Sequence, residues 1–167
     1  MDDSTLRVKD AAGTILFSAK GKWLHPLFML EDFLAGPGAG VSVSVPGASF
    51  SVSGQTVPIA SAVLEDKIIG LGAAALLIRM GFKRCHALLL SRLAIPLLEK
   101  YGVAYTFDEQ VDRLGCMTED IIHIDDSLDL IHAELSRRAG RAAPKADSIV
   151  ATQGSFKGTF SREGMKD

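Results

Sequence analysis

The sequence is poor in cysteine and contains no long apolar run, and each absence excludes a class of protein. The two cysteines, Cys85 and Cys116, are too few among 167 residues for a disulfide-stapled scaffold. The longest apolar windows, 68–78 and 87–98, are too short to span a bilayer. No N-terminal segment joins basic residues to an apolar stretch as a signal peptide does. We therefore expect a cytoplasmic protein with no membrane partner.

A large excess of charge of one sign is also absent. The formal net charge is −2, so the whole-chain electrostatics favour neither nucleic acid nor a membrane surface. The charge is uneven, because residues 137–167 carry seven Lys or Arg against three Asp or Glu, a net of +4, which leaves −6 on residues 1–136. This basic end has no hydrophobic periodicity, which predicts a disordered tail over 137–167. It lacks sustained basicity, so we do not expect it to bind nucleic acid.

The sequence does contain an alternation of short apolar runs and helical patterns between residues 57 and 107. The predicted strands are 58–64, 86–91 and 103–107, and the predicted helices are 65–80 and 92–101. Such an alternation builds a parallel sheet from crossover units. Because 47% of the residues are hydrophobic, a single domain over 1–136 can bury a sizeable core. The sequence therefore predicts an α/β fold, with ligands where strand ends meet helix starts.

Further elements complete the predicted domain. Two short runs around a glycine-containing turn, at 6–8 and 14–17, predict a β-hairpin, and apolar residues at helical spacing predict a helix over 23–34. Residues 36–56 begin with a Gly-Pro cluster and then alternate Val or Phe with Ser, which is typical of an inserted β-ribbon. Ile121, Ile122 and Ile124 predict a last strand, followed by a capped helix that begins near Ser127.

The predicted helix starts carry groups that favour an anion. Backbone N–H groups and the helix dipole attract negative charge there, and Lys67 and Arg92 add positive charge. Ser91 can cap and donate, and a glycine such as Gly70 lets a ligand approach the backbone closely. These features indicate a phosphorylated or nucleotide-like ligand, bound with the help of Asp66. Alternatively, the acidic residues only cap the helix, and the glycines only allow tight helix-on-sheet packing.

Several short motifs resemble an uncharacterised bacterial family, the domain of unknown function 1893. They are Pro26-Leu27, Asp66-Lys67-Ile68-Ile69-Gly70, Ala73-Ala74-Ala75-Leu76-Leu77, Met80-Gly81, and the pair Cys116 and Glu119. The resemblance covers about residues 6–135 without the ribbon, and it adds Cys116 and Glu119 to the candidate ligand-binding residues. It implies a cytidine deaminase-like, three-layer α/β/α fold: a mixed sheet of about five strands with helices on both faces and an N-terminal hairpin. It implies no particular function.

The chemistry of a zinc deaminase is missing from the predicted helix starts. Such an enzyme needs a His or Cys with a Glu at one helix start and a Pro-Cys-x-x-Cys pair at the next. Residues 64–67 and 91–94 contain neither Cys nor His. The four histidines are dispersed, without the spacing of metal ligands. We therefore expect neither zinc-dependent deamination nor a bound metal or cofactor.

Two other functions stay open at this point. Cys116, three residues before Glu119 in a polar loop, could be a nucleophile or a redox thiol, although a neighbouring carboxylate raises the pKa of a thiol. A regulatory or scaffold protein is the other alternative, because the alternating strand at 41–45 could pair edge to edge with a second copy to form a homo-oligomer. Cys85, beside a predicted core strand, is expected to be an inert packed thiol.

Overall fold

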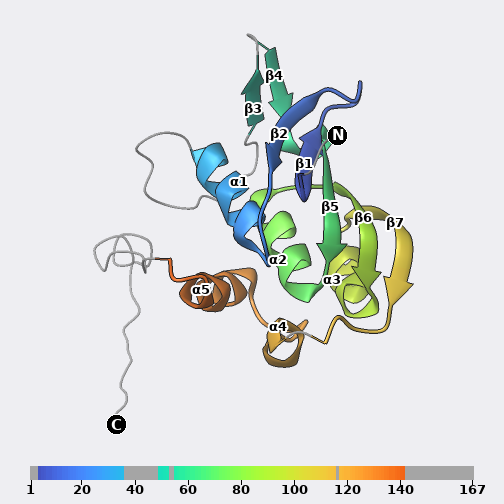
Figure 1. Cartoon of the computed structure of the whole chain (residues 1–167), viewed down its shortest axis with the longest axis vertical. Helices are drawn as coiled ribbons and strands as arrows, with labels where there is room; N and C mark the ends of the chain where they lie inside the picture. Colours follow the sequence, from blue (N-terminus) through green and yellow to red (C-terminus); the bar gives the residue numbers. More distant parts are fainter. Residues whose placement is uncertain (1–3, 36–48, 53–54, 116, 142–167) are drawn as a thin grey trace.

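The computed structural model of the chain describes residues 4–35, 49–52, 55–115 and 117–141. The strands are β1 (Leu6–Lys9), β2 (Ile15–Ala19), β3 (Ser49–Val52), β4 (Gln55–Pro58), β5 (Val63–Ile69), β6 (Arg84–Ser91) and β7 (Ala104–Val111). The helices are α1 (His25–Ala35), α2 (Leu71–Met80), α3 (Ile95–Lys100), α4 (Met117–Ile121) and α5 (Leu128–Arg138), with short 3-10 helices η1 (Ile59–Ser61) and η2 (Arg92–Ala94). Figure 1 shows how these elements are arranged.

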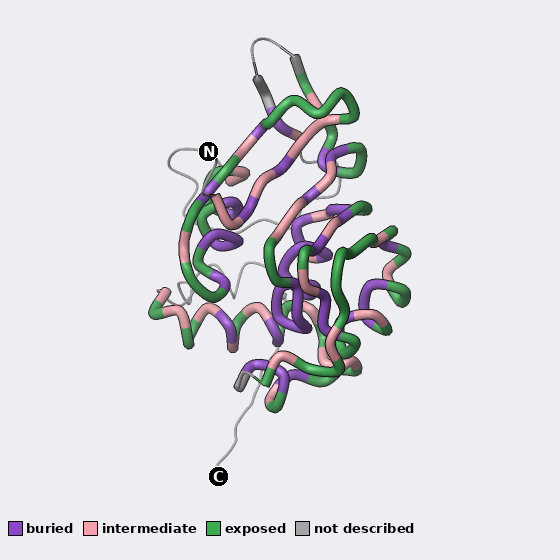
Figure 2. The backbone as a smooth tube through the Cα atoms, turned by 45° about the vertical axis from the view of Figure 1, so that its right-hand side comes forward, coloured by how far each residue is buried: buried purple, intermediate pink, exposed green. Residues whose placement is uncertain are grey.

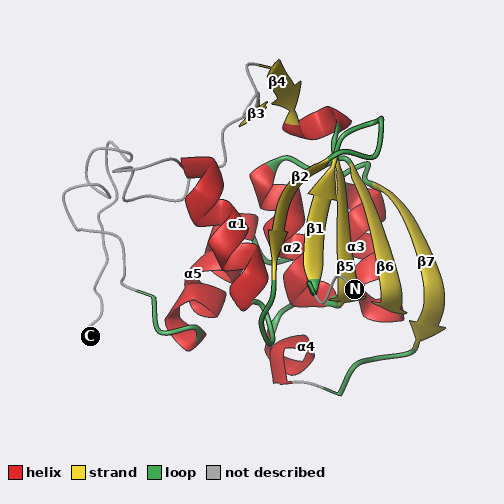
Figure 3. Cartoon of the chain, turned by 45° about the horizontal axis from the view of Figure 1, so that its top comes forward, coloured by secondary structure: helices red, strands yellow, loops and turns green. Residues whose placement is uncertain are grey.

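A five-stranded mixed sheet, in the order β2-β1-β5-β6-β7, organises the fold (Figure 3). β1 pairs antiparallel with both β2 and β5, whereas β5, β6 and β7 run parallel. The predicted hairpin is confirmed as β1–β2. The side chain of Asp10 closes the turn by accepting hydrogen bonds from the N–H groups of Ala12 and Thr14. Gly13 completes the turn with a φ of +88°, a conformation that suits glycine. The α/β class and the mixed sheet are therefore confirmed.

The described helices α1, α2, α3 and α5 lie on one side of this sheet (Figures 1 and 3). Strand residues that face these helices, such as Val8, Leu64 and Ala87, are buried. Every residue of α2 except Arg79 is buried as well (Figure 2). The opposite face carries polar groups, among them Glu65, which is within ion-pair distance of both Arg7 and Lys9 on the neighbouring strand. The expectation of helices on both faces is thus not met in the described residues, where charged strand positions leave that face open to solvent.

The junction between β5 and α2 differs from the prediction, and the difference moves the candidate site. The predicted strand 58–64 and helix 65–80 are in fact β4, η1, β5 and α2, so residues 65–69 belong to a strand. Glu65 pairs with Arg7 on one side and with His86 on the other, and Asp66 pairs with Leu6 and Ala87. Pairing with two neighbouring strands outweighs the local pattern, in which a run of charged residues is typical of a first helical turn. Helix α2 begins only after Gly70.

The C-terminal part also corrects one element and confirms two others. The predicted strand at Ile121, Ile122 and Ile124 is wrong, because α4 occupies Met117–Ile121 and packs against α2. The predicted strand 103–107 continues to Val111 as the edge strand β7. The cap of α5 is confirmed, since the Ser127 side chain accepts a hydrogen bond from the N–H of Leu130 at 3.1 Å.

The inserted ribbon and the tail are described only in part. β3 and β4 form a separate antiparallel pair, and Phe50 of β3 reaches the core, where its ring centroid lies 6.4 Å from that of Phe82. The strand expected at 41–45, with its proposed edge pairing, lies outside the described residues, as does the tail from 142 onward. The described chain stays packed through Arg141, whose guanidinium lies 4.6 Å from the Phe28 ring centroid.

Candidate functional site

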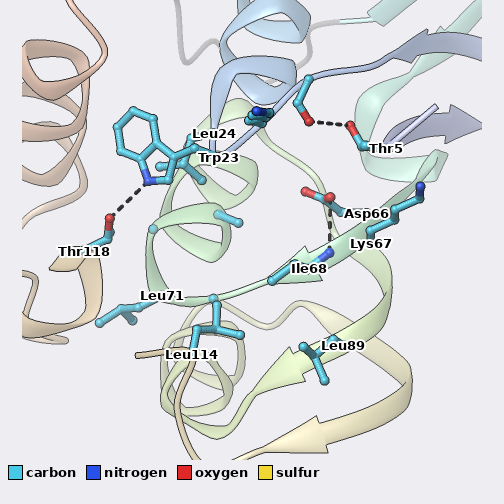
Figure 4. A pocket seen from close by; sticks show the side chains of 15 residues that line it. Thr5, Trp23, Leu24, Asp66, Lys67, Ile68, Leu71, Leu89, Leu114 and Thr118 are labelled. Atoms are coloured by element: carbon cyan, nitrogen blue, oxygen red, sulfur yellow. Dashed lines mark hydrogen bonds between the residues drawn. The ribbon is translucent and has the colours of Figure 1, made fainter. Parts of the chain in front are cut away.

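A pocket of about 560 Å³ lies near the carboxyl ends of β5 and β6, beside the start of α2 (Figure 4). This size is within the range of pockets that bind small molecules. Its walls come from the residue before β1, the segment before α1, β5, the start of α2, β6, the loop after β7, and α4. The lining residues are Thr5, Gly21, Lys22, Trp23, Leu24, Asp66, Lys67, Ile68, Gly70, Leu71, Gly72, Ala73, Leu89, Leu114 and Thr118.

The floor of the pocket is the buried first turn of α2. Gly70 is the N-cap residue, and its carbonyl already accepts from the N–H of Ala74 at 2.9 Å. No described side chain caps this helix, so the N–H groups of the next three residues, 71–73, have no partner within the helix. Gly72 allows the close approach of α4, because a Cβ there would lie 2.8 Å from Thr118 Cγ2. The floor therefore offers hydrogen-bond donors within an otherwise apolar surface.

Asp66 places a carboxyl group on the helix-facing side of the sheet. Burial raises the pKa of this carboxyl from its ordinary value of 3.8 to about 7, although backbone hydrogen bonds from Ile68 and Lys67 act in the opposite direction. The group can therefore be charged or neutral near neutral pH. Close by, burial and, to a lesser degree, the charge of Asp66 raise the pKa of the Cys85 thiol to about 12, so this buried thiol stays protonated, as expected of an inert packed cysteine.

The mouth of the pocket carries exposed, mobile side chains. Lys22 and Lys67 are both exposed and bring positive charge to it. Trp23 is 42% exposed, and its indole Nε1 donates a hydrogen bond to Thr118 Oγ1 at 3.3 Å, as Figure 4 shows. Its backbone has a φ of +54°, a conformation that costs a bulky residue about 1–2 kcal/mol and that is found most often at functional sites.

Glu119 lies directly behind the pocket wall and is only 7% exposed. One carboxylate oxygen, Oε1, accepts a hydrogen bond from the N–H of Leu114 at 2.6 Å. The other oxygen, Oε2, is buried and has no hydrogen-bond partner among the described residues. A Cβ built on Gly70 would lie 3.2 Å from this oxygen, so Oε2 faces the start of α2.

The structure brings together four of the seven predicted site residues. Asp66, Lys67 and Gly70 line the pocket, and Glu119 adjoins it. Ser91 and Arg92 are not among the pocket's lining residues. Ser91 is buried as the cap of η2, where its hydroxyl accepts from the N–H of Leu93, and Arg92 is exposed near Asp112 at 3.4 Å. Cys116, the candidate thiol, lies outside the described residues, and its role stays a prediction.

Sequence reasoning missed the residues that reach the pocket from distant parts of the chain. Trp23 and Thr118 are 95 positions apart, and no local pattern links them. The one available signal is the isolated tryptophan before Pro26, which is predicted only as the first residue of the helix over 23–34.

Within the described residues, no three His, Cys, Asp or Glu side chains gather closely enough to hold a metal ion. None of the described helices is both long and apolar enough to cross a membrane.

Comparison with known proteins shows which family and which solved structure the chain resembles. The described part is an α/β protein whose parallel strands end at a pocket. Residues 52–119 match the model of a family described as a domain of unknown function (DUF1893), which confirms the family resemblance. The crystal structure of a DUF1893 family protein from Thermotoga maritima is similar, with a TM-score of 0.59 and 23% identity over 81% of each chain. No curated protein matches the chain.

Proposed function

We propose that the chain binds a small phosphorylated, nucleotide-like ligand in the pocket at the start of α2. The observation that carries the proposal is the combination of an apolar cavity of about 560 Å³, amide donors on its floor that have no partner within α2, and two lysines at its mouth. Ligand pockets are mostly apolar, with a few polar groups that fix the orientation of the ligand.

Each part of the pocket suits one part of such a ligand. Leu24, Leu71 and Leu89 provide an apolar surface for a flat ring, and Trp23 provides an aromatic one at the mouth. Lys22 and Lys67 are exposed and can follow a phosphate group without being desolvated. The proposal does not involve zinc, since the starts of α2 and η2 carry no Cys or His to hold it.

Titration calorimetry of the full chain with nucleoside 5′-monophosphates tests this proposal. We expect saturable binding and a rise in melting temperature, because a ligand that binds only the folded state stabilises it. Lys67→Ala and Lys22→Ala should each weaken binding about 3- to 10-fold, as the loss of one charge-assisted hydrogen bond does. Lys83→Ala is the matched control, because Lys83 is an exposed lysine whose Nζ instead binds the carbonyl of Tyr101.

Two results would contradict the proposal. One is the absence of saturable binding for every nucleoside monophosphate. The other is binding that Lys83→Ala weakens as much as Lys67→Ala does, because the phosphate would then be attracted by general surface charge rather than by the mouth of the pocket.

A further inference from the structure

Glu119 carries a buried hydrogen-bond acceptor with no partner among the described residues. The side chain is more than nine-tenths buried, and Oε1 is used by the N–H of Leu114, but Oε2 has no donor. A buried polar atom without a hydrogen bond costs on the order of 1–3 kcal/mol, so such atoms are rare. An acceptor held in this state is suited to receive a donor from a ligand.

Oε2 lies close to Gly70, the residue that precedes the amide donors on the pocket floor. It lies 3.2 Å from the Cβ position of Gly70, and Gly70 both lines the pocket and precedes residues 71–73, whose amides have no partner within α2. The side chain of Leu114 covers Gly70 on this side, since its Cδ1 lies 2.5 Å from the same Cβ position. The unpaired acceptor and the amides of the first turn of α2 therefore both lie beside Gly70.

We propose that Glu119 Oε2 and the first amides of α2 together recognise the edge of a lactam or amide-bearing ring, which presents an N–H donor beside a carbonyl acceptor. The proposal deepens the function proposed above, on which it rests, and it sets the orientation of the ligand. The ring edge enters toward Gly70 and displaces the side chain of Leu114, which covers this side of Gly70 in the structure, and the phosphate stays at the mouth beside Lys22 and Lys67.

The charges favour this orientation over the reverse one. A phosphate on the floor would approach the buried carboxylate of Glu119, and the repulsion between like charges is strong in such a poorly solvated place. A ring N–H pointed at Oε2 instead forms a charge-assisted hydrogen bond and relieves the unpaired acceptor. The two lysines that line the pocket are exposed to solvent.

Matched ligands that differ in a single ring donor test the proposal on the full chain. Uridine 5′-monophosphate is compared with 3-methyluridine 5′-monophosphate, in which a methyl group replaces the ring N–H. Uracil is compared with 3-methyluracil as a phosphate-free pair. We expect methylation to weaken binding to the natural chain at least 10-fold, because it leaves buried polar groups unpaired.

Glu119→Gln shows whether the preference comes from this carboxylate. The glutamine keeps an oxygen for the N–H of Leu114 but presents an amide donor in place of Oε2, so the preference for the unmethylated ring should disappear. Leu114→Ala keeps the backbone N–H that holds Oε1 and uncovers Oε2, so the preference should persist. The melting temperature of each variant shows that it is folded.

The outcomes separate this inference from the function proposed above. A preference for uracil over 3-methyluracil that Glu119→Gln abolishes supports the inference, even if Lys67→Ala has no effect. Binding of both uridine monophosphates with equal affinity overturns the inference and leaves phosphate binding intact. The failure of all four compounds to bind overturns the inference, and the other nucleoside monophosphates then decide the function proposed above.

Discussion

Two buried glutamates, Glu31 and Glu119, meet opposite surroundings in this molecule. Glu31 on α1 is 4% exposed and lies 2.9 Å from His132, 3.3 Å from Arg79 and 3.5 Å from Arg141. Glu119 on α4 is 7% exposed and receives a single backbone hydrogen bond. One carboxylate has three basic partners, whereas the other has an oxygen with none among the described residues.

The difference separates a structural cluster from the proposed binding site. The basic partners of Glu31 come from α2, α5 and the residues after α5, so this cluster fastens the C-terminal helix to the body of the domain. Glu119 fastens only the loop at Leu114, and its second oxygen lies beside Gly70 at the start of α2. Buried carboxylate oxygens are nearly always hydrogen-bonded, so an unpaired one beside a cavity is a candidate acceptor for a ligand.

The largest effect is expected from Glu31→Gln. This change removes the buried negative charge that Arg79, His132 and Arg141 share. Arg79 keeps its contact with Asp129 and Arg141 keeps its contact with Asp32, so we expect a loss at the lower end of the range of about 3–5 kcal/mol that breaking a buried ion pair costs. Urea unfolding monitored by circular dichroism measures the loss. A loss below about 1 kcal/mol would mean that the cluster is no stronger than a surface salt bridge.

Asp66→Asn should have the next largest effect, and it should depend on pH. The folded-state pKa of about 7 exceeds the ordinary value of 3.8, so the folded chain holds this proton more tightly than the unfolded chain. The stability that Asp66 contributes is therefore fully present below pH 3.8 and is lost as pH rises through about 7. Asn removes this loss, so the variant should gain about 1–3 kcal/mol relative to the natural chain at about pH 8.

Unfolding curves measured across this pH range check the prediction for Asp66. The difference in the free energy of unfolding between the variant and the natural chain should grow from pH 4 to pH 7 and then stay level. A difference that is constant with pH would show that the carboxyl is not titrating in the folded state near neutrality.

The smallest effect on stability is expected from Glu119→Gln. The bond from Leu114 is kept, and the atom that is replaced has no partner to lose, so the free energy of unfolding should change by less than about 1 kcal/mol. Measured beside Glu31→Gln under the same conditions, this variant sharpens the contrast between the two glutamates. If Glu119→Gln lowered the free energy of unfolding as much as Glu31→Gln does, Glu119 would be a residue that stabilises the fold.

Local patterns in the sequence were enough for much of the fold. The turn around Gly13, the strand that ends at Ser91, and the cap at Ser127 each depend on residues within a few positions of one another, and each is found in the structure. The charged run at 65–67 misled the prediction, because its conformation is decided by pairing with β1 and β6 rather than by its own residues.

The candidate site was only partly predictable for the same reason. Asp66, Lys67 and Gly70 were predicted because they lie together in one short motif, 66–70. Glu119 was predicted from the family resemblance alone. The contribution of Trp23 depends on a contact with Thr118, which only the folded chain brings near. Ser91 and Arg92 sit at a second strand end, yet their side chains serve the η2 cap and a surface pair.

The most direct test of the account follows the indole N–H of Trp23 by NMR during titration with uridine 5′-monophosphate. Trp23 is the only tryptophan in the chain, so its indole resonance reports on this pocket without further assignment. We predict a saturable shift of this resonance together with the amides of Gly70 and Gly72, and a much smaller response in Lys67→Ala at the same ligand concentration. Saturable shifts confined to other parts of the chain, with the indole resonance unmoved, would contradict the account.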